Sequence, residues 1–227
     1  MIQYLAGAPD LLARYRNAPP AARAVIEAAM DARRLGMRPA LPLAFLRAAG
    51  PGYVTRTEWE LLGEDWLEQT LAYTAQPCKG VRGPVTQIRP HPNGTPAGSA
   101  GNPGSPVYQL ADYLDQVSRR TRQDVVIPAS FWDVAGAYAD PGDLMLLANA
   151  AHSRGLYRQT AQLYKNAAAA GDPKAATLLV GLMHQLHPGD RRPASHAAIC
   201  PHLEDPFAVA LLMRQLRKPV LTNRCRT

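Results

Sequence analysis

Histidine and cysteine are the side chains that zinc selects, and the sequence places five of them between residues 184 and 202. They are His184, His187, His196, Cys200 and His202. Their separations match no known zinc pattern, because structural sites pair ligands at short, regular spacings. We therefore interpret them as solvated residues of a degenerate helical repeat, and we predict no bound metal.

Other side chains that could do acid–base or nucleophilic chemistry form no complete set. Glu64, Asp65 and Glu68 are neighbouring carboxylates, but carboxylates on a helix face usually serve solvation. Cys78 stands beside Lys79, yet no partner histidine can be located for it. The chain has neither a G-x-S-x-G elbow nor a G-x-x-x-x-G-K-[ST] phosphate loop. We predict that the protein is not an enzyme and needs no cofactor.

The composition indicates a folded protein of one or two globular domains. Of the 227 residues, 47% are hydrophobic and 19% are charged, which is too apolar for general disorder. The three cysteines include no C-x-x-C pair, so we expect reduced thiols. Because no apolar run could span a bilayer and the amino terminus lacks a secretion signal, we predict a cytoplasmic protein that does not associate with membranes.

The net charge of +7 raises the question of nucleic-acid binding. The basic residues are scattered over four places rather than along one stripe. They are Arg33-Arg34, Arg119-Arg120 with Arg122, Arg191-Arg192, and a tail of Arg214, Arg217, Lys218, Arg224 and Arg226. Since only clustered cations make a phosphate-binding surface, we favour ordinary solvated arginines over a dedicated face for nucleic acid.

The clearest periodicity lies between Asp140 and Pro173 and predicts a pair of antiparallel helices. The apolar residues of the first helix recur at i, i+3, i+4 and i+7; they are Leu144, Leu147, Ala148 and Ala151. Arg154-Gly155 interrupts this pattern. The apolar residues of the second helix are Tyr157, Ala161, Tyr164 and Ala167 or Ala168. Gly171 ends it, because glycine adopts the left-handed closing conformation most easily.

Asp-Pro opens this unit and recurs after it, at Asp172 and Asp205, with separations of 32 and 33 residues. A fixed period of this length is typical of helical solenoids. The unit resembles a tetratricopeptide repeat in five places: Gly155, Tyr157, Tyr164, Ala167 and Gly171-Asp172-Pro173. Thr160 departs from the family, which prefers alanine there, and the second copy is degenerate.

The resemblance implies a binding surface, because the first helix of each pair lines a concave groove in this family. The inward-facing residues would be Met145, Asn149, His152, Leu179, Met183 and Leu186. A groove that is partly polar and partly apolar suits an extended or helical peptide. The alternative is that these residues only contact the next turn of the solenoid, and both readings remain open.

Residues 20–35 predict an amphipathic helix that ends at Gly36. One face is apolar, and the other carries Arg23, Glu27, Asp31 and Arg34, which we expect to face solvent. A second helix should run from Pro42-Leu43 to Ala49. A third should follow a capping box at 57–60, carry Leu62, Trp66 and Tyr73, and end before Pro77. The large aromatics should pack in the core; they are Trp59, Trp66, Phe131 and Trp132.

Two short alternating segments, 85–88 and 107–110, predict the strands of a β-hairpin around the Pro/Gly/Ser-rich loop 90–106. Three helices and a hairpin follow the order of a winged helix. Several segments resemble the winged-helix region of STAND-type signalling ATPases of actinobacteria: AARAVIEAAMDARRLG, the stretch from PGYVTRTEWELL to VRGP, YQLADYLDQ and IPASFWDVA. In relatives a histidine before the corner aspartate contacts nucleotide, but here Ala111 precedes Asp112, so we expect no nucleotide binding.

A winged helix could bind DNA, and this is the alternative function. A recognition helix needs basic or amide side chains, whereas the third predicted helix is acidic and would be repelled by phosphates. The alternative contacts are Arg82 and Arg89, which flank the hairpin. We disfavour nucleic acid as a partner and prefer a protein or peptide.

Together these patterns predict a mainly α protein. It should comprise an N-terminal segment (1–18), a winged-helix-like domain (19–122) with one β-hairpin and a flexible wing loop (90–106), a short α-solenoid of helix–turn–helix repeats (123–217) and a disordered tail (218–227). Because the array stops early, we expect a fragment of a larger signalling protein that lacks its ATPase domain. Its uncapped last repeat would expose Val209, Leu212 and Met213 and favour self-association.

Overall fold

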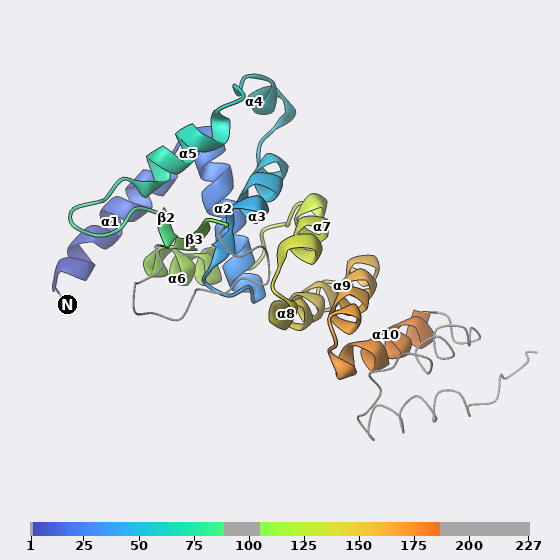
Figure 1. The fold of residues 1–227 in the computed structure, drawn as a ribbon. Coiled ribbons are helices and arrows are strands. Elements are labelled where there is room, and N and C mark those ends of the chain that lie inside the picture. Colours follow the sequence, from blue (N-terminus) through green and yellow to red (C-terminus); the bar gives the residue numbers. More distant parts are fainter. Residues whose placement is uncertain (1, 89–104, 187–227) are drawn as a thin grey trace, which may run out of the picture. The chain divides into compact units, whose positions relative to one another are not determined.

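The computed structural model describes residues 2–88 and 105–186, with side chains from residue 7 onward. This part is mainly helical and contains one small antiparallel sheet (Figure 1). The chain divides into two compact units, Met1–Leu147 and Ala148–Thr227, with the boundary inside one helix, α8. No helix within the described residues is both long and apolar enough to cross a membrane.

The first unit contains most of the secondary structure. Its elements are α1 (Ile2–Arg16), α2 (Pro20–Leu35), β1 (Leu41–Pro42), α3 (Leu43–Ala49), the 3-10 helix η1 (Gly50–Tyr53), α4 (Arg56–Glu60), α5 (Trp66–Ala75), β2 (Val85–Ile88), β3 (Val107–Leu110), α6 (Asp112–Thr121), α7 (Ala129–Tyr138) and the start of α8 (Pro141–His152). The second unit contains the end of α8, α9 (Tyr157–Ala169) and α10 (Pro173–Leu186).

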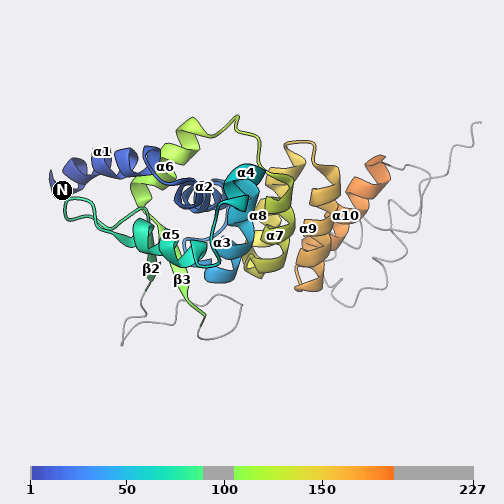
Figure 2. The same ribbon diagram turned by 90° about the horizontal axis from the view of Figure 1, so that it is seen from above.

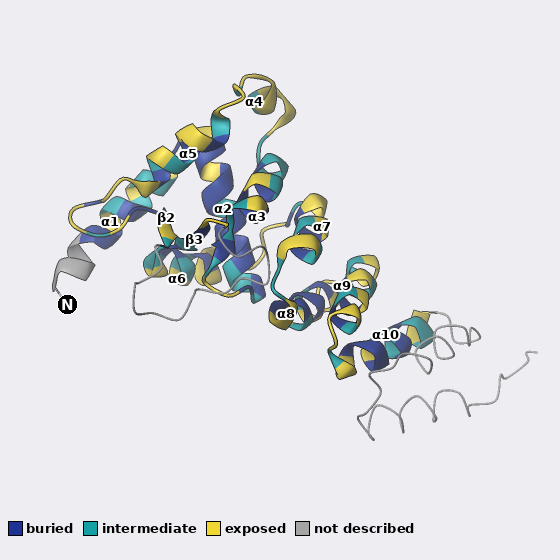
Figure 3. Ribbon diagram, in the orientation of Figure 1, coloured by how far each residue is buried: buried dark blue, intermediate teal, exposed yellow. Residues whose placement is uncertain are grey.

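The first unit is built around α2, which packs against α3, η1, α5 and α6 (Figures 1 and 2). The predicted bounds of this helix and its closing residue, Gly36 at φ 113°, are confirmed. The predicted solvent face is only partly correct: Arg23 is exposed, but Asp31 is fully buried and the Arg34 side chain is 5% exposed. Most of α2 is buried (Figure 3). Elements that follow later in the chain cover this face, so α2 is enclosed nearly all round.

The predicted hairpin is confirmed, with Val85 opposite Leu110 and Ile88 opposite Val107. The sheet has a third strand that the sequence did not indicate, since β1 pairs with β3 and places Leu41 opposite Tyr108. A strand of two residues is too short to show alternation. The predicted wing loop lies largely outside the described residues.

The third predicted helix is wrong in its extent. The capping box joins Thr55 to Glu58, two residues earlier than expected, and opens the five-residue helix α4. The segment 61–65, which contains Gly63, then interrupts the helix before α5 begins. Glycine is a poor helix former, which is consistent with a break at this place. Trp59 is 40% exposed, so the expectation that it is a core residue is also wrong.

The helices predicted for the second unit are confirmed. Gly155, at φ 71°, lies in the turn between α8 and α9, and Gly171, at φ 93°, lies between α9 and α10. Thr160 is buried, and its hydroxyl donates a hydrogen bond to the Leu156 carbonyl at 2.9 Å, so its polar group is satisfied. The third Asp-Pro at residue 205 and the predicted tail lie outside the described residues.

Candidate functional site

The six residues of the predicted groove fall into two groups. Met145 lies in the part of α8 that belongs to the first unit, and the other five lie in the second unit. The α8 residues Asn149 and His152 are exposed. On α10, Leu179 and Met183 are half-buried, and Leu186 is 38% exposed.

The polar residues of the predicted groove also hold the helix pair together. The Tyr164 hydroxyl on α9 donates a hydrogen bond to Asn149 Oδ1 at 3.0 Å, and burial raises the pKa of this hydroxyl, so it stays a donor. The His152 and Tyr157 rings meet edge to face at 5.9 Å. Asn149 therefore contributes to the packing of α8 on α9, the two helices of the same predicted pair. Both readings of the predicted groove stay open.

The apolar residues of the predicted groove remain partly accessible on α10. Leu179, Met183 and Leu186 follow i, i+4, i+7 and share one face of the helix. We call these three residues the α10 stripe. The fully buried positions of α10 are different residues: Ala175, Ala176, Thr177, Val180 and Leu182. Leu182 is the largest of these buried residues, and the α10 stripe lies beside them and is only partly covered.

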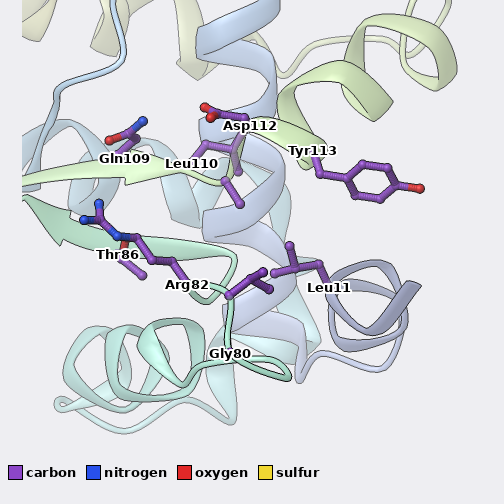
Figure 4. A pocket seen from close by; sticks show the side chains of 10 residues that line it. Leu11, Gly80, Arg82, Thr86, Gln109, Leu110, Asp112 and Tyr113 are labelled. Carbon is purple, nitrogen blue, oxygen red and sulfur yellow. The ribbon is translucent and has the colours of Figure 1, made fainter. Parts of the chain in front are cut away.

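A pocket of about 380 Å³ lies in the first unit between α1, the 80–82 turn, the sheet and the start of α6 (Figure 4). Leu11 and Leu110 supply apolar walls. Arg82, Gln109 and Asp112 supply polar groups. The lining comes from segments that are far apart in the sequence, so no local motif could have indicated it.

This pocket includes Ala111 and Asp112, the corner at which relatives place a nucleotide-contacting histidine. The Ala111 methyl group can donate no hydrogen bond, and its backbone N–H is already donated to the Pro84 carbonyl at 2.9 Å. The described lining offers one cation, Arg82, and one carboxylate, Asp112. A polyphosphate needs several donors and disfavours a nearby carboxylate. The chemistry of the pocket does not suit a nucleotide, and the absence of nucleotide binding stays a prediction.

A buried network of charged side chains lies beside α2. Asp31 accepts hydrogen bonds from Arg122 Nε and Nη2, both at 3.0 Å, from Arg34 Nε at 2.7 Å and from the Tyr53 hydroxyl at 2.9 Å. Burial alone would lower the pKa of Arg122, but hydrogen bonding and the charges of Asp31 and Glu27 raise it above its usual value. A fully bonded carboxylate of this kind fixes structure and leaves no lone pair for chemistry.

Four arginines of the two basic clusters at 33–34 and 119–122 form ion pairs with carboxylates on α2 and α6. Arg33 pairs with Asp115 at 3.0 Å, and Arg119 pairs with the same carboxylate at 2.9 Å. Arg34 and Arg122 pair with Asp31. These arginines are therefore tied to carboxylates and do not form an open phosphate-binding face.

The structure also describes other residues singled out from the sequence. Glu64, Asp65 and Glu68 are exposed. The Cys78 thiol is buried, and the Lys79 ammonium pairs with Asp10 at 3.0 Å. Across residues 7–88 and 105–186, no group of three or more His, Cys, Asp or Glu side chains could hold a metal. Most of the predicted histidine and cysteine set lies outside the described residues.

No protein-family model matches the chain, and neither the curated proteins nor the solved structures include a match. The resemblance to tetratricopeptide repeats and to the winged-helix region of STAND-type ATPases therefore stays a prediction.

Proposed function

We propose that the protein is a noncatalytic interaction module that binds a peptide or protein segment through the helices of its second unit. The observation that carries this proposal is the α10 stripe. Three large apolar side chains at helical spacing stay at least partly accessible, although α10 already has a buried face that contains Ala175, Ala176, Val180 and Leu182. An amphipathic helix packs on such a stripe with its own apolar face.

The proposal agrees with the role that the sequence resemblance implies, a regulatory piece of a signalling protein without an ATPase domain. The alternative, a DNA-binding regulator, is less consistent with the charges. The segment from α4 to α5 carries five carboxylates and one arginine between residues 55 and 68, which a phosphate backbone would repel.

The test is a selection of displayed amphipathic helical peptides on the full chain, followed by affinity measurements with variants. Met183→Glu and Leu186→Glu place a charge in the stripe, and each should weaken binding about tenfold or more, because a buried carboxylate without a partner is costly. Gln185→Glu is the matched control, since it adds the same charge at an exposed position of the same helix.

Unchanged affinity in both stripe variants would remove α10 as the binding surface. A gel shift with random duplex DNA at low salt tests the alternative. Tight binding that weakens steeply with salt would favour the DNA-binding function instead.

A further inference from the structure

The first unit carries a second exposed apolar surface, formed by α4 and the segment that joins it to α5. We call residues 55–65 the α4 tip. Leu61 is 83% exposed and Trp59 is 40% exposed, and most of the α4 tip is drawn as exposed in Figure 3. Trp59 and Leu61 are two positions apart on a helical turn, so they point to different sides, and Trp59 packs on Trp66. Leu61 is therefore the apolar side chain of the α4 tip that a partner could contact.

The α4 tip is held in one conformation by its own contacts. The Thr55 hydroxyl accepts a hydrogen bond from the Glu58 N–H at 3.2 Å, and the Glu58 carboxylate accepts one from the Thr55 N–H at 2.7 Å. Trp59 packs edge to face on Trp66 with ring centroids 5.5 Å apart. A surface that is already ordered loses little entropy on binding, which favours recognition.

The segment that contains Leu61 is acidic. Residues 55–68 have a net charge of −4, in a chain whose net charge is +7. Hydrogen bonds from Thr55 to the Glu58 carboxylate lower the pKa of Glu58, and nearby Arg23 contributes to this shift. Glu60 pairs with Arg56 and Asp65 accepts from Gln69, but Glu64 and Glu68 have no partner among the described residues.

We propose that the α4 tip docks a basic amphipathic protein segment, with an apolar residue of the segment against Leu61 and its lysines or arginines against Glu64 and against Glu68 at the start of α5. The negative charge of residues 55–68 indicates a basic partner, because these carboxylates repel nucleic acid and anionic membranes and attract cations. The α4 tip and the α10 stripe lie in different units, so this proposal stands apart from the proposed function.

The test uses a designed helical peptide with leucine on one face and lysine on the other, and a second peptide in which every lysine is glutamate. The full chain should bind the lysine peptide, with a Kd on the order of 10–100 μM, and not the glutamate peptide. Leu61→Ser should weaken binding about tenfold. Glu64→Gln with Glu68→Gln should weaken it and reduce its dependence on salt.

Val126→Ser is the matched control, because Val126 is 89% exposed in the same unit but outside the α4 tip. The proposal is overturned if Leu61→Ser and Val126→Ser bind the lysine peptide equally, if the glutamate peptide binds as well, or if neither peptide binds. Concentration-dependent self-association that Leu61→Ser abolishes would assign the α4 tip to a second copy of the chain and would also overturn it.

Discussion

The contacts that stabilise the interior of the first unit differ in kind from those that stabilise the second. In the first unit, Arg122, the residue after α6, forms a buried ion pair with Asp31 of α2, 91 positions away in the sequence. In the second, the side-chain hydrogen bond between Asn149 and Tyr164 spans 15 positions. Removing one partner of a buried ion pair should therefore destabilise the first unit strongly, because the other charge stays buried. Removing a contact between neighbouring helices of the second unit should have a smaller, local effect.

The tryptophans allow the two units to be followed separately. All three, Trp59, Trp66 and Trp132, lie in the first unit. Tryptophan fluorescence during denaturation therefore reports the first unit, while circular dichroism reports the helices of both.

The largest effect is expected from Arg122→Met. Asp31 would stay buried with one of its two cations removed, so the free energy of unfolding of the first unit should fall by about 3–5 kcal/mol. Arg119→Met is the control in α6. The Arg119 side chain is 54% exposed, so loss of its ion pair with Asp115 should cost less than about 1 kcal/mol. Equal losses in the two variants, measured by tryptophan fluorescence in urea, would contradict the role assigned to the buried network.

Gly36→Ala should cause the next largest loss of unfolding free energy. Gly36 has φ 113°, and an added Cβ would lie 2.6 Å from Leu146 Cβ. The strained backbone and the clash together should cost about 2–4 kcal/mol. Gly155→Ala is the control in the second unit: φ is 71°, but no atom lies within 4 Å of the added carbon, so about 1–2 kcal/mol is expected. Thermal denaturation by circular dichroism compares the two, and a larger loss in Gly155→Ala would contradict this account.

Alkaline pH should weaken the first unit. Burial, together with the charge and hydrogen bond of Glu27, raises the pKa of Tyr15 from 10.0 to about 12. Because the folded state holds this proton more tightly, its contribution is complete below about pH 10 and is lost as the pH rises toward 12. Tyr15→Phe should flatten the decline of unfolding free energy over this range, and Tyr138→Phe, at an exposed position, should leave it unchanged. Identical profiles for both variants would contradict the prediction.

The smallest effect is expected from Tyr164→Phe in the second unit. It removes the hydrogen bond to Asn149 and should cost about 1 kcal/mol. Amide exchange in α8 and α9 should quicken, while the midpoint of tryptophan fluorescence stays the same. Adding Asn149→Ala should cost little more than either single change, since both remove the same bond. A fully additive loss would show that the bond does not link the two helices.

Local patterns predicted much of the secondary structure. The apolar period of residues 20–35, the strands around the glycine-rich loop, and the turns at Gly155 and Gly171 all follow from residues close in sequence. Such patterns carry this information because helix faces, strand alternation and left-handed glycines are properties of short segments.

The interior of the first unit could not be predicted in the same way. The polar row of α2 is equally consistent with solvent and with an ion-pair network, and only Arg122, far along the chain, decides between them. Exposure of Trp59 could not be inferred either, because an aromatic at helical spacing is usually buried. The pocket at Ala111 and the strand β1 likewise depend on segments brought together from several parts of the chain.

The candidate binding surfaces also depend partly on the sequence alone and partly on tertiary structure. The sequence by itself determined which residues of α10 share one face, because a helix places i, i+4 and i+7 together. It also determined the acidic charge around Leu61. Tertiary structure alone decided which of these side chains stay accessible, since exposure depends on what the rest of the chain covers, and it turned Asp31 from a predicted surface residue into the buried centre of the first unit.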